Sequence, residues 1–208
     1  MDNEILENYE RFLENKKLYK SFGYDLDAER EFILEEAKPL YGKILEAGAG
    51  KGYFSLALAK QGYSFVAFDI SEEELRFAKL NLAYFRLDKC ADFKIDDAEH
   101  TSFSDESFDI IFSVNTIHHL RNTYKVVDEL GRILSRGGKL ILSDFTEEGF
   151  KIVDKVHAFE GKTHEISRVT LSDVKSYLSK KGFSVKQTNS EYQHVLVIRK
   201  NFDDEHND

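Results

Sequence analysis

The chain has 208 residues, a single cysteine and a formal net charge of -9 at pH 7. This length suffices for one domain with a substantial core. The negative charge argues against a surface built to bind a nucleic-acid backbone, so small molecules are the expected partners. One cysteine excludes an intramolecular disulfide framework and a cysteine zinc cluster. The first residues lack an apolar signal core and no apolar run approaches the roughly 20 residues that span a bilayer, so we expect a cytoplasmic protein without a membrane partner.

Two helices are expected ahead of the first strand. Apolar residues recur at helical spacing over residues 3–20. A second helix should be capped by Asp25 or Asp27 and should stop near Pro39. We predict that residues 1–40 form a helical segment that covers the site as a lid, with its aromatic side chains either in the core or on the inner surface of that lid.

After these helices, short apolar runs rich in β-branched and aromatic residues alternate with helical stretches. The expected strands cover residues 43–47, 63–69, 91–96, 108–114 and 139–144, the last after a helix that ends at Gly137-Gly138. This alternation predicts an α/β fold with a doubly wound, mostly parallel sheet. Two further runs, joined by two or three residues, must pair antiparallel. We therefore predict seven strands, with a C-terminal antiparallel strand, in one domain over residues 41–200, and a disordered acidic tail over 201–208.

Three alternating glycines, Gly48, Gly50 and Gly52, lie between the first strand of the sheet and the next helix. A strand that ends in such a turn presents free backbone N–H groups at the carboxyl edge of the sheet, where polar ligands bind. The pattern fits neither phosphate motif. A dinucleotide fingerprint needs a third glycine where Tyr53 stands, and a P-loop needs Ser or Thr after the lysine, whereas Gly52 follows Lys51.

Four motifs occur in a fixed order along the chain. They are LEAGAGKG at 45–52, Asp69 at the end of the next strand, the pair Asp97-Ala98, and NTIHHL from Asn115. Together they resemble the class I S-adenosylmethionine-dependent methyltransferases, in particular the small-molecule enzymes of the ubiquinone and menaquinone type. The resemblance covers residues 40–145 by motif. It implies a Rossmann-like methyltransferase fold and S-adenosylmethionine as the cofactor.

The resemblance also implies where the cofactor lies. In the family the glycine loop passes the methionyl part, an acid after the second strand holds the ribose hydroxyls, and an Asp-Ala pair lies near the adenine. The residues assigned in this way to cofactor binding are Glu46, Gly48, Gly50, Gly52, Asp69, Ile70, Asp97, Ala98 and Asn115. Asp96 is an alternative to Asp97, and Asp69 could instead support the helix that Ser71 caps.

Histidines follow several of the predicted strands. His118 and His119 come after the fourth strand, beside the methyl group in the family, and are the candidate catalytic residues, although one of them could serve packing alone. The residues expected to line the acceptor pocket are Tyr19, Tyr24, His157, His164 and His194. The spacing of the histidines matches no ligand motif, so we expect no metal.

The sequence thus predicts an S-adenosylmethionine-dependent methyltransferase that acts on a small-molecule acceptor by in-line transfer, as a monomer or homodimer. A nicotinamide-dependent oxidoreductase would share the fold and Asp69, but it needs the glycine pattern that is missing. A non-catalytic S-adenosylmethionine-binding module would keep the fold with damaged cofactor motifs. Neither an N-P-P-Y or D-P-P-Y motif nor a Pro-Cys pair occurs, which disfavours the nucleic-acid methyltransferases that use them.

Overall fold

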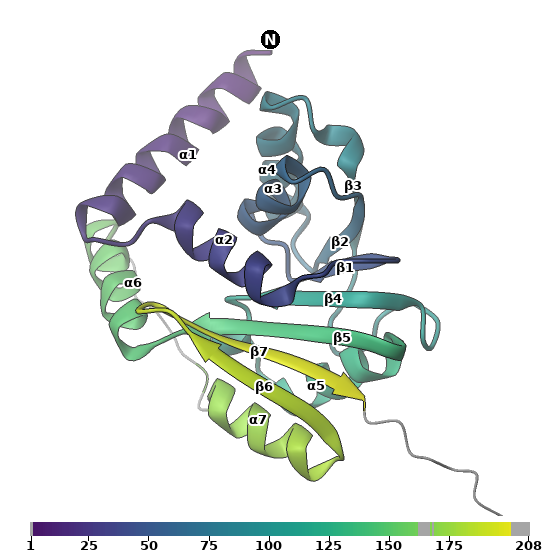
Figure 1. Cartoon of the computed structure of the whole chain (residues 1–208). Coiled ribbons are helices and arrows are strands. Elements are labelled where there is room, and N and C mark those ends of the chain that lie inside the picture. The colour runs from purple at the N-terminus through teal and green to yellow at the C-terminus, as the bar shows by residue number, and fades with distance from the viewer. Residues whose placement is uncertain (1, 162–166, 168, 201–208) are drawn as a thin grey trace, which may run out of the picture.

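The computed structural model describes residues 2–161, 167 and 169–200. A seven-stranded sheet forms its centre, in the order β3-β2-β1-β4-β5-β7-β6 (Figure 1). The strands are β1 (Ile44–Ala47), β2 (Phe65–Asp69), β3 (Ala91–Ile95), β4 (Phe108–Val114), β5 (Leu134–Phe145), β6 (Phe183–Asn189) and β7 (Gln193–Lys200). Neighbouring strands are parallel from β3 to β5, and β7 is antiparallel to both β5 and β6. The predicted fold class is confirmed.

Helices cover both faces of this sheet. They are α1 (Asn3–Ser21), α2 (Leu26–Ala37), α3 (Tyr53–Lys60), α4 (Glu72–Tyr84), α5 (Thr123–Ile133), α6 (Glu147–Phe159) and α7 (Leu171–Lys180). Residues of α2, α3 and α4 join the core on one face, with Ile44 of β1, and residues of α5 and α7 join the core on the other, with Leu45. Successive side chains of a strand point to opposite faces, which explains this division. None of the described helices is long and apolar enough to cross a bilayer.

The two N-terminal helices form where the sequence predicts them. Asp25 caps α2 by accepting hydrogen bonds from the backbone N–H groups of Asp27 and Ala28 at 3.1 and 3.3 Å. In Figure 1, α1 extends along the side of the molecule from α4 to α6, and both contacts occur. The second helix, α2, lies against α3 and β7. A role for this segment as a moving lid stays a prediction.

β5 begins earlier than the sequence predicts. The expected strand over 139–144 would follow a helix that ends at Gly137-Gly138, but β5 starts at Leu134, directly after α5. The pairing with β4 shifts its register between Phe108 and Ile110, and Gly137 has a φ of 76°. Extra residues in one strand of a pair are accommodated by such a bulge. The two glycines therefore mark an irregular strand and not the end of a helix.

A buried carboxylate fixes the loop between β3 and β4. Glu129 on α5 accepts hydrogen bonds from the N–H and the hydroxyl of Thr101 at 2.8 and 2.7 Å, and it pairs with Arg132. Arg132 also donates to the Phe103 carbonyl at 2.9 Å. The Arg132 guanidinium, and then the Thr101 donors, hold the pKa of Glu129 at about 2 despite its burial. The loop that follows β3 is thereby anchored to α5.

We expect Glu129→Gln to lower the free energy of unfolding at pH 7 by about 1.5–3 kcal/mol, the loss typical of hydrogen bonds to a charged group. The folded pKa lies below the unfolded value of 4.5. The carboxylate therefore stabilises the fold fully above that value, and the contribution is lost as the pH falls towards about 2. Urea unfolding across this range measures the difference between the two proteins.

Glu73→Gln is the matched control, because Glu73 is exposed on α4 and forms no hydrogen bond or ion pair with the described residues. If Glu129→Gln were as stable as Glu73→Gln at neutral pH, the loop would be held by other contacts.

Candidate functional site

A cavity of about 960 Å³, called here the main cavity, opens at the carboxyl ends of β1, β2, β3 and β4. The predicted residues on its wall are Gly48, Gly50, Asp69, Ile70, Asp97, Ala98, Asn115, His119 and His157. A smaller cavity of about 190 Å³, the side cavity, shares Arg30, Tyr53 and Asn115 with it and adds Tyr19 and His118. Open α/β sheets bind ligands at this edge. The fold thus gathers most of the sequence-predicted residues around two adjoining spaces.

The glycine loop has its first backbone N–H groups already bonded within the protein. The N–H groups of Gly48 and Ala49 donate to the Phe68 carbonyl at 2.9 and 3.0 Å. The N–H of Gly50 donates to Asp69 Oδ2 at 2.8 Å. The prediction of free donors is therefore wrong for these three residues. A loop with occupied donors is poorly suited to a phosphate group, which needs several free N–H groups around it.

The three glycines of the loop serve different purposes. A Cβ at Gly48 would lie 2.7 Å from Thr116 Cγ2, and a Cβ at Gly52 would lie 2.6 Å from Ala78 Cβ, whereas no atom would be closer than 3.9 Å at Gly50. The φ angle is 76° at Gly48, 51° at Gly50 and 74° at Gly52, and residues other than glycine rarely adopt such positive values. Gly52 therefore packs against α4 and is not on the cavity wall where we predicted it. Gly50 leaves open space for a ligand.

Asp69 ends β2 with both carboxylate oxygens bonded to the backbone. Oδ2 accepts from the Gly50 N–H, and Oδ1 accepts from the Ser71 N–H at 2.9 Å. The second bond is the helix-supporting role that we considered as the alternative, although the Ser71 hydroxyl also caps α4. Each carboxylate oxygen can accept more than one hydrogen bond. Asp69 can therefore hold the loop and accept from ligand hydroxyls at the same time.

Asp97 and its alternative Asp96 both line the main cavity. Their hydrogen bonds distinguish them. Asp96 Oδ2 accepts from the N–H and the hydroxyl of Ser102 at 2.9 and 2.7 Å, and its Oδ1 accepts from the Asp97 N–H. The Asp97 side chain accepts one bond, from the Glu99 N–H at 2.9 Å to Oδ1, and its Oδ2 has no partner among the described residues. Asp97 is thus the acid with more capacity left for a ligand.

Glu46 is a buried residue of β1 that does not line the main cavity, and its assignment to cofactor binding stays a prediction. The residue is 2% exposed, and its Oε2 accepts a hydrogen bond from Ser55 Oγ at 2.5 Å. Burial raises the pKa of Glu46 to about 8, and the Ser55 hydroxyl and the Arg30 guanidinium offset this only in part. The carboxyl therefore carries a proton at neutral pH and bonds to the first turn of α3 through Ser55.

Arg30 of α2 lines both cavities, and no pattern in the sequence marks it. Its Nη1 donates to the Leu26 carbonyl at 2.6 Å, and its guanidinium carbon lies 5.3 Å from the centroid of the Tyr53 ring. Its buried Nε has no hydrogen-bond partner, and no carboxylate pairs with it, within the described ranges. A guanidinium in this state is unfavourable unless an anion joins it. The side chain is suited to hold a ligand carboxylate.

Asn115 lies between the two cavities in a left-handed backbone conformation, with a φ of 54°. Its N–H donates to the Ser143 carbonyl at 2.8 Å. Its side-chain Oδ1 is buried and has no partner in the part of the chain that is described. Strained backbone and unsatisfied polar atoms are features that proteins retain at functional sites. A hydrogen-bond donor on a ligand would satisfy this oxygen.

His118 and His119 belong to a short helix, η2 (Ile117–His119), directly after β4. Their ring centroids are 4.0 Å apart, and both residues line the side cavity. His118 Nδ1 lies 2.6 Å from Asp144 Oδ1, and Asp144 Oδ2 accepts from the His118 N–H at 3.0 Å. The Asp144 carboxylate thus fixes the orientation of the His118 ring and favours the tautomer with its proton on Nδ1.

The aromatic residues ahead of α2 divide between the side cavity and the core. Tyr19 lines the side cavity, and its assignment to the acceptor pocket stays a prediction. Tyr24 does not line this cavity, because it is 1% exposed and accepts a hydrogen bond from Gln193 Nε2 at 2.8 Å. Its ring packs in a cluster with Ile152 and Val156 of α6. The assignment of Tyr24 to the acceptor pocket is therefore corrected: it joins the N-terminal segment to α6.

The other histidines predicted for the acceptor pocket do not all lie at the cavities. His157 of α6 lines both cavities. His194 lines neither cavity. Its Nδ1 lies 2.6 Å from Asn189 Oδ1, and this contact holds the ring in the β6–β7 hairpin. The assignment of His194 to the acceptor pocket is therefore corrected. His164 falls outside the described residues. Among the residues that are described, no group of three or more histidine, cysteine or acidic side chains is arranged to hold a metal ion.

Known proteins resemble this chain over the glycine loop and the central strands. Residues 45–142 match the model of the methyltransferase domain family. The malonyl-[acyl-carrier protein] O-methyltransferase of Erwinia pyrifoliae is 31% identical over 140 residues, which is 66% of this chain. The demethylmenaquinone methyltransferase of Clavibacter sepedonicus is 35% identical over 104 residues, or 50% of this chain. The chain spans 51% and 41% of the lengths of these two relatives.

The fold has a counterpart over nearly its whole length. A solved structure from Methanococcus maripaludis covers 97% of this chain and 95% of its own, with a TM-score of 0.71 and 21% identity. At that identity the likeness concerns the fold alone. The family match over residues 45–142, with the glycine loop and the acids after β2 and β3, makes this part of the chain similar to the class I S-adenosylmethionine-dependent methyltransferases.

We expect Glu46→Gln to change how the stability of the ligand-free protein depends on pH. The pKa of Glu46 is about 8 in the folded protein and 4.5 in the unfolded chain. Between these values the folded carboxyl keeps a proton that the unfolded chain releases, so the free energy of unfolding falls as the pH rises and levels off above about 8. Glutamine does not titrate, and this decline should be absent from the variant.

Urea unfolding at about pH 5 and about pH 9 measures the effect, with Glu73→Gln as the exposed control. A decline of the same size in Glu46→Gln and in the unaltered protein would mean that another group causes it.

Proposed function

We propose that this protein transfers the methyl group of S-adenosylmethionine to a small-molecule acceptor by in-line displacement. One observation carries the proposal: the wall of the main cavity has Asp69 and Asp97 after β2 and β3, Asn115 after β4, Arg30 on α2, and the open position of Gly50 after β1. A nucleoside with hydroxyl groups at one end and an amino acid at the other matches this distribution of acceptors and charge.

The cavity suits this cofactor better than a dinucleotide. Its volume of about 960 Å³ lies in the usual range for ligand pockets. The loop N–H groups that would hold a pyrophosphate are already bonded to Phe68 and Asp69. S-adenosylmethionine carries a sulfonium, and no phosphate, at the point where it would pass Gly50. This argues against the nicotinamide-dependent alternative on grounds of hydrogen bonding as well as sequence.

S-adenosylmethionine supplies a methyl group on a positively charged sulfur, which is an effective leaving group. The nucleophile of the acceptor forms the new bond to the methyl carbon, the electron pair of the broken bond returns to sulfur, and the acceptor proton passes to a base. Alignment of two bound reactants can contribute on the order of 7–11 kcal/mol. The residues that position the two molecules should therefore matter most.

The His118–Asp144 pair is the base that we propose for the acceptor proton. A carboxylate bonded to Nδ1 orients the ring, directs Nε2 to the opposite side and stabilises the imidazolium that forms on protonation. His119 lines both cavities and is the second candidate. A positioned base contributes roughly 10²–10⁴ in rate. Such a base suits an oxygen acceptor with a removable proton, in line with the O-methyltransferase among the relatives.

We expect calorimetry to detect binding of S-adenosylmethionine and S-adenosylhomocysteine, and no binding of NAD. Asp69→Ala should weaken both by about ten- to a hundredfold, since the loss of hydrogen bonds to a charged group costs about 1.5–3 kcal/mol. Asp92→Ala is the control, because Asp92 is exposed on β3 and does not line the cavity. Binding of NAD without a response to either sulfur compound would overturn the proposal, and unchanged affinity in folded Asp69→Ala would remove Asp69 from the site.

Arg30→Ala offers a sharper test of how the cofactor lies. The variant should bind S-adenosylhomocysteine about tenfold or more weakly, because a carboxylate loses its charged partner. It should bind 5′-methylthioadenosine as the unaltered protein does, since that nucleoside lacks the amino-acid end. Titration of both ligands into both proteins makes the comparison. An equal loss for the two nucleosides would show that Arg30 maintains the shape of the cavity and does not bind the carboxylate.

A further inference from the structure

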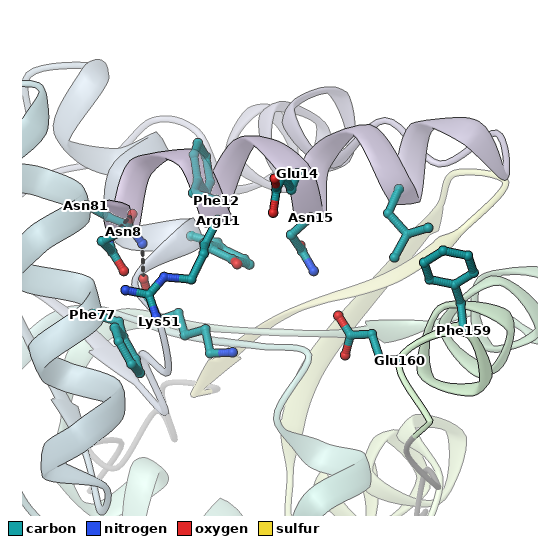
Figure 2. A pocket seen from close by; sticks show the side chains of 12 residues that line it. Asn8, Arg11, Phe12, Glu14, Asn15, Lys51, Phe77, Asn81, Phe159 and Glu160 are labelled. Carbon is teal, nitrogen blue, oxygen red and sulfur yellow. Dashed lines mark hydrogen bonds between the residues drawn. The ribbon is translucent and has the colours of Figure 1, made fainter. Parts of the chain in front are cut away.

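A third cavity, of about 570 Å³, lies beneath α1 (Figure 2). It is called here the α1 cavity, and α1, α3, α4, the glycine loop and the end of α6 contribute to its wall. It adjoins the two cavities already described, because Tyr53 lines all three and Lys51 lines both this one and the main cavity. The proposed function uses the other two and leaves this space without a role.

Two cations without a carboxylate partner lie at one end of the α1 cavity. The guanidinium carbon of Arg11 and Nζ of Lys51 each lie 6.0 Å from the centroid of the Phe77 ring. Arg11 donates to a backbone carbonyl, and neither cation forms an ion pair with any described residue. Arg76 lies nearer the same ring, with its guanidinium carbon 5.0 Å from the centroid, but it is paired with Glu4. Arg11 and Lys51 are both exposed, and an anion held between them would gain two charged partners.

The acidic residues of this cavity are Glu14 and Glu160. Figure 2 shows Glu160 and Phe159 projecting from the end of α6, across the space from Arg11 and Phe77. Glu14 is exposed on α1, three residues after Arg11, without an ion pair to it. An anion is favoured at the Arg11 end and disfavoured at the α6 end.

The middle of the cavity offers apolar surface and one side-chain amide. The rings of Phe12 and Tyr53 pack with their centroids 5.2 Å apart. Figure 2 shows the Asn15 side chain pointing from α1 into the space with its amide nitrogen foremost. This nitrogen can donate a hydrogen bond to an acceptor on a ligand.

A buried amide pair fixes the cationic end relative to the glycine loop. Asn8 Nδ2 donates to Asn81 Oδ1 at 2.8 Å, and Asn81 Nδ2 donates to the Lys51 carbonyl at 2.8 Å. The first bond joins α1 to α4, and the second joins α4 to the loop. The backbone of Lys51 is thereby held next to Gly50, at the boundary between the α1 cavity and the main cavity.

We propose that the α1 cavity binds the remote end of an elongated acceptor, and that this end carries an oxyanion, a carboxylate or a phosphate, between Arg11 and Lys51. The inference rests on the proposed function, because the reacting end of the same molecule would pass Tyr53 into the side cavity. The body of the acceptor packs on the Phe12 and Phe77 rings. Binding energy from a remote group can then serve to align the reacting atoms.

Phenyl phosphate and benzoate are suitable probes, with benzyl alcohol as the neutral counterpart. They are titrated into protein saturated with S-adenosylhomocysteine, so that the cofactor carboxylate occupies Arg30. We expect the anions to bind at least about tenfold more tightly than benzyl alcohol, and Arg11→Ala to remove that preference, as the loss of a charged hydrogen bond predicts. A preference for phenyl phosphate identifies a phosphate as the oxyanion, and a preference for benzoate identifies a carboxylate.

Lys79→Ala is the matched control, because Lys79 is exposed on α4, away from the cavity wall, and forms no ion pair with the described residues. Equal binding of the three probes, no binding of either anion, or unchanged anion affinity in Arg11→Ala would overturn the inference. The affinity for S-adenosylhomocysteine is measured first on every protein. Failure to bind it contradicts the proposed function, whereas intact binding of it without anion binding contradicts the inference about the α1 cavity alone.

Discussion

The hydrogen bond from the Gly50 N–H to Asp69 is the contact on which the site depends. With the two bonds to the Phe68 carbonyl, it ties the loop after β1 to the end of β2. The protein itself therefore maintains the shape of the loop, and the position without a side chain faces the main cavity. The same bonds explain why this loop is not suited to a dinucleotide. Its N–H groups already donate to the end of β2 and cannot also surround a pyrophosphate.

Features with a local cause could be predicted from the sequence. The strands follow from the alternation of short apolar runs with helical stretches, and the start of α2 follows from the capping preference of Asp25. Features that depend on distant contacts could not. Tyr24 enters the core because the turn after α1 meets α6, and His194 is held by Asn189 across a hairpin. Arg30 reaches the site because α2 packs against α3, which brings the guanidinium over the Tyr53 ring, and no spacing in the sequence indicates this contact.

The glycine motif located the site but did not separate packing from binding. Gly52 is required by the approach of Ala78 on α4, and Glu46 bonds to Ser55 in the first turn of α3. Both lie within the motif, and both act through a neighbouring part of the fold. The preference for Asp97 over Asp96 also depends on a contact that the motif does not contain. Ser102 donates two hydrogen bonds to Asp96 and none to Asp97, so Asp97 stays available to a ligand.

Tyr53 is the first residue of α3 and borders all three cavities, with the Arg30 guanidinium over its ring and Phe12 beside it. Any molecule that enters one space meets the same ring as a molecule in the next. The occupancies are then coupled through one side chain, because the rotamer that suits the first ligand limits what is offered to the second. Because such coupling is reciprocal, each reactant should change the affinity of the protein for the other by the same factor.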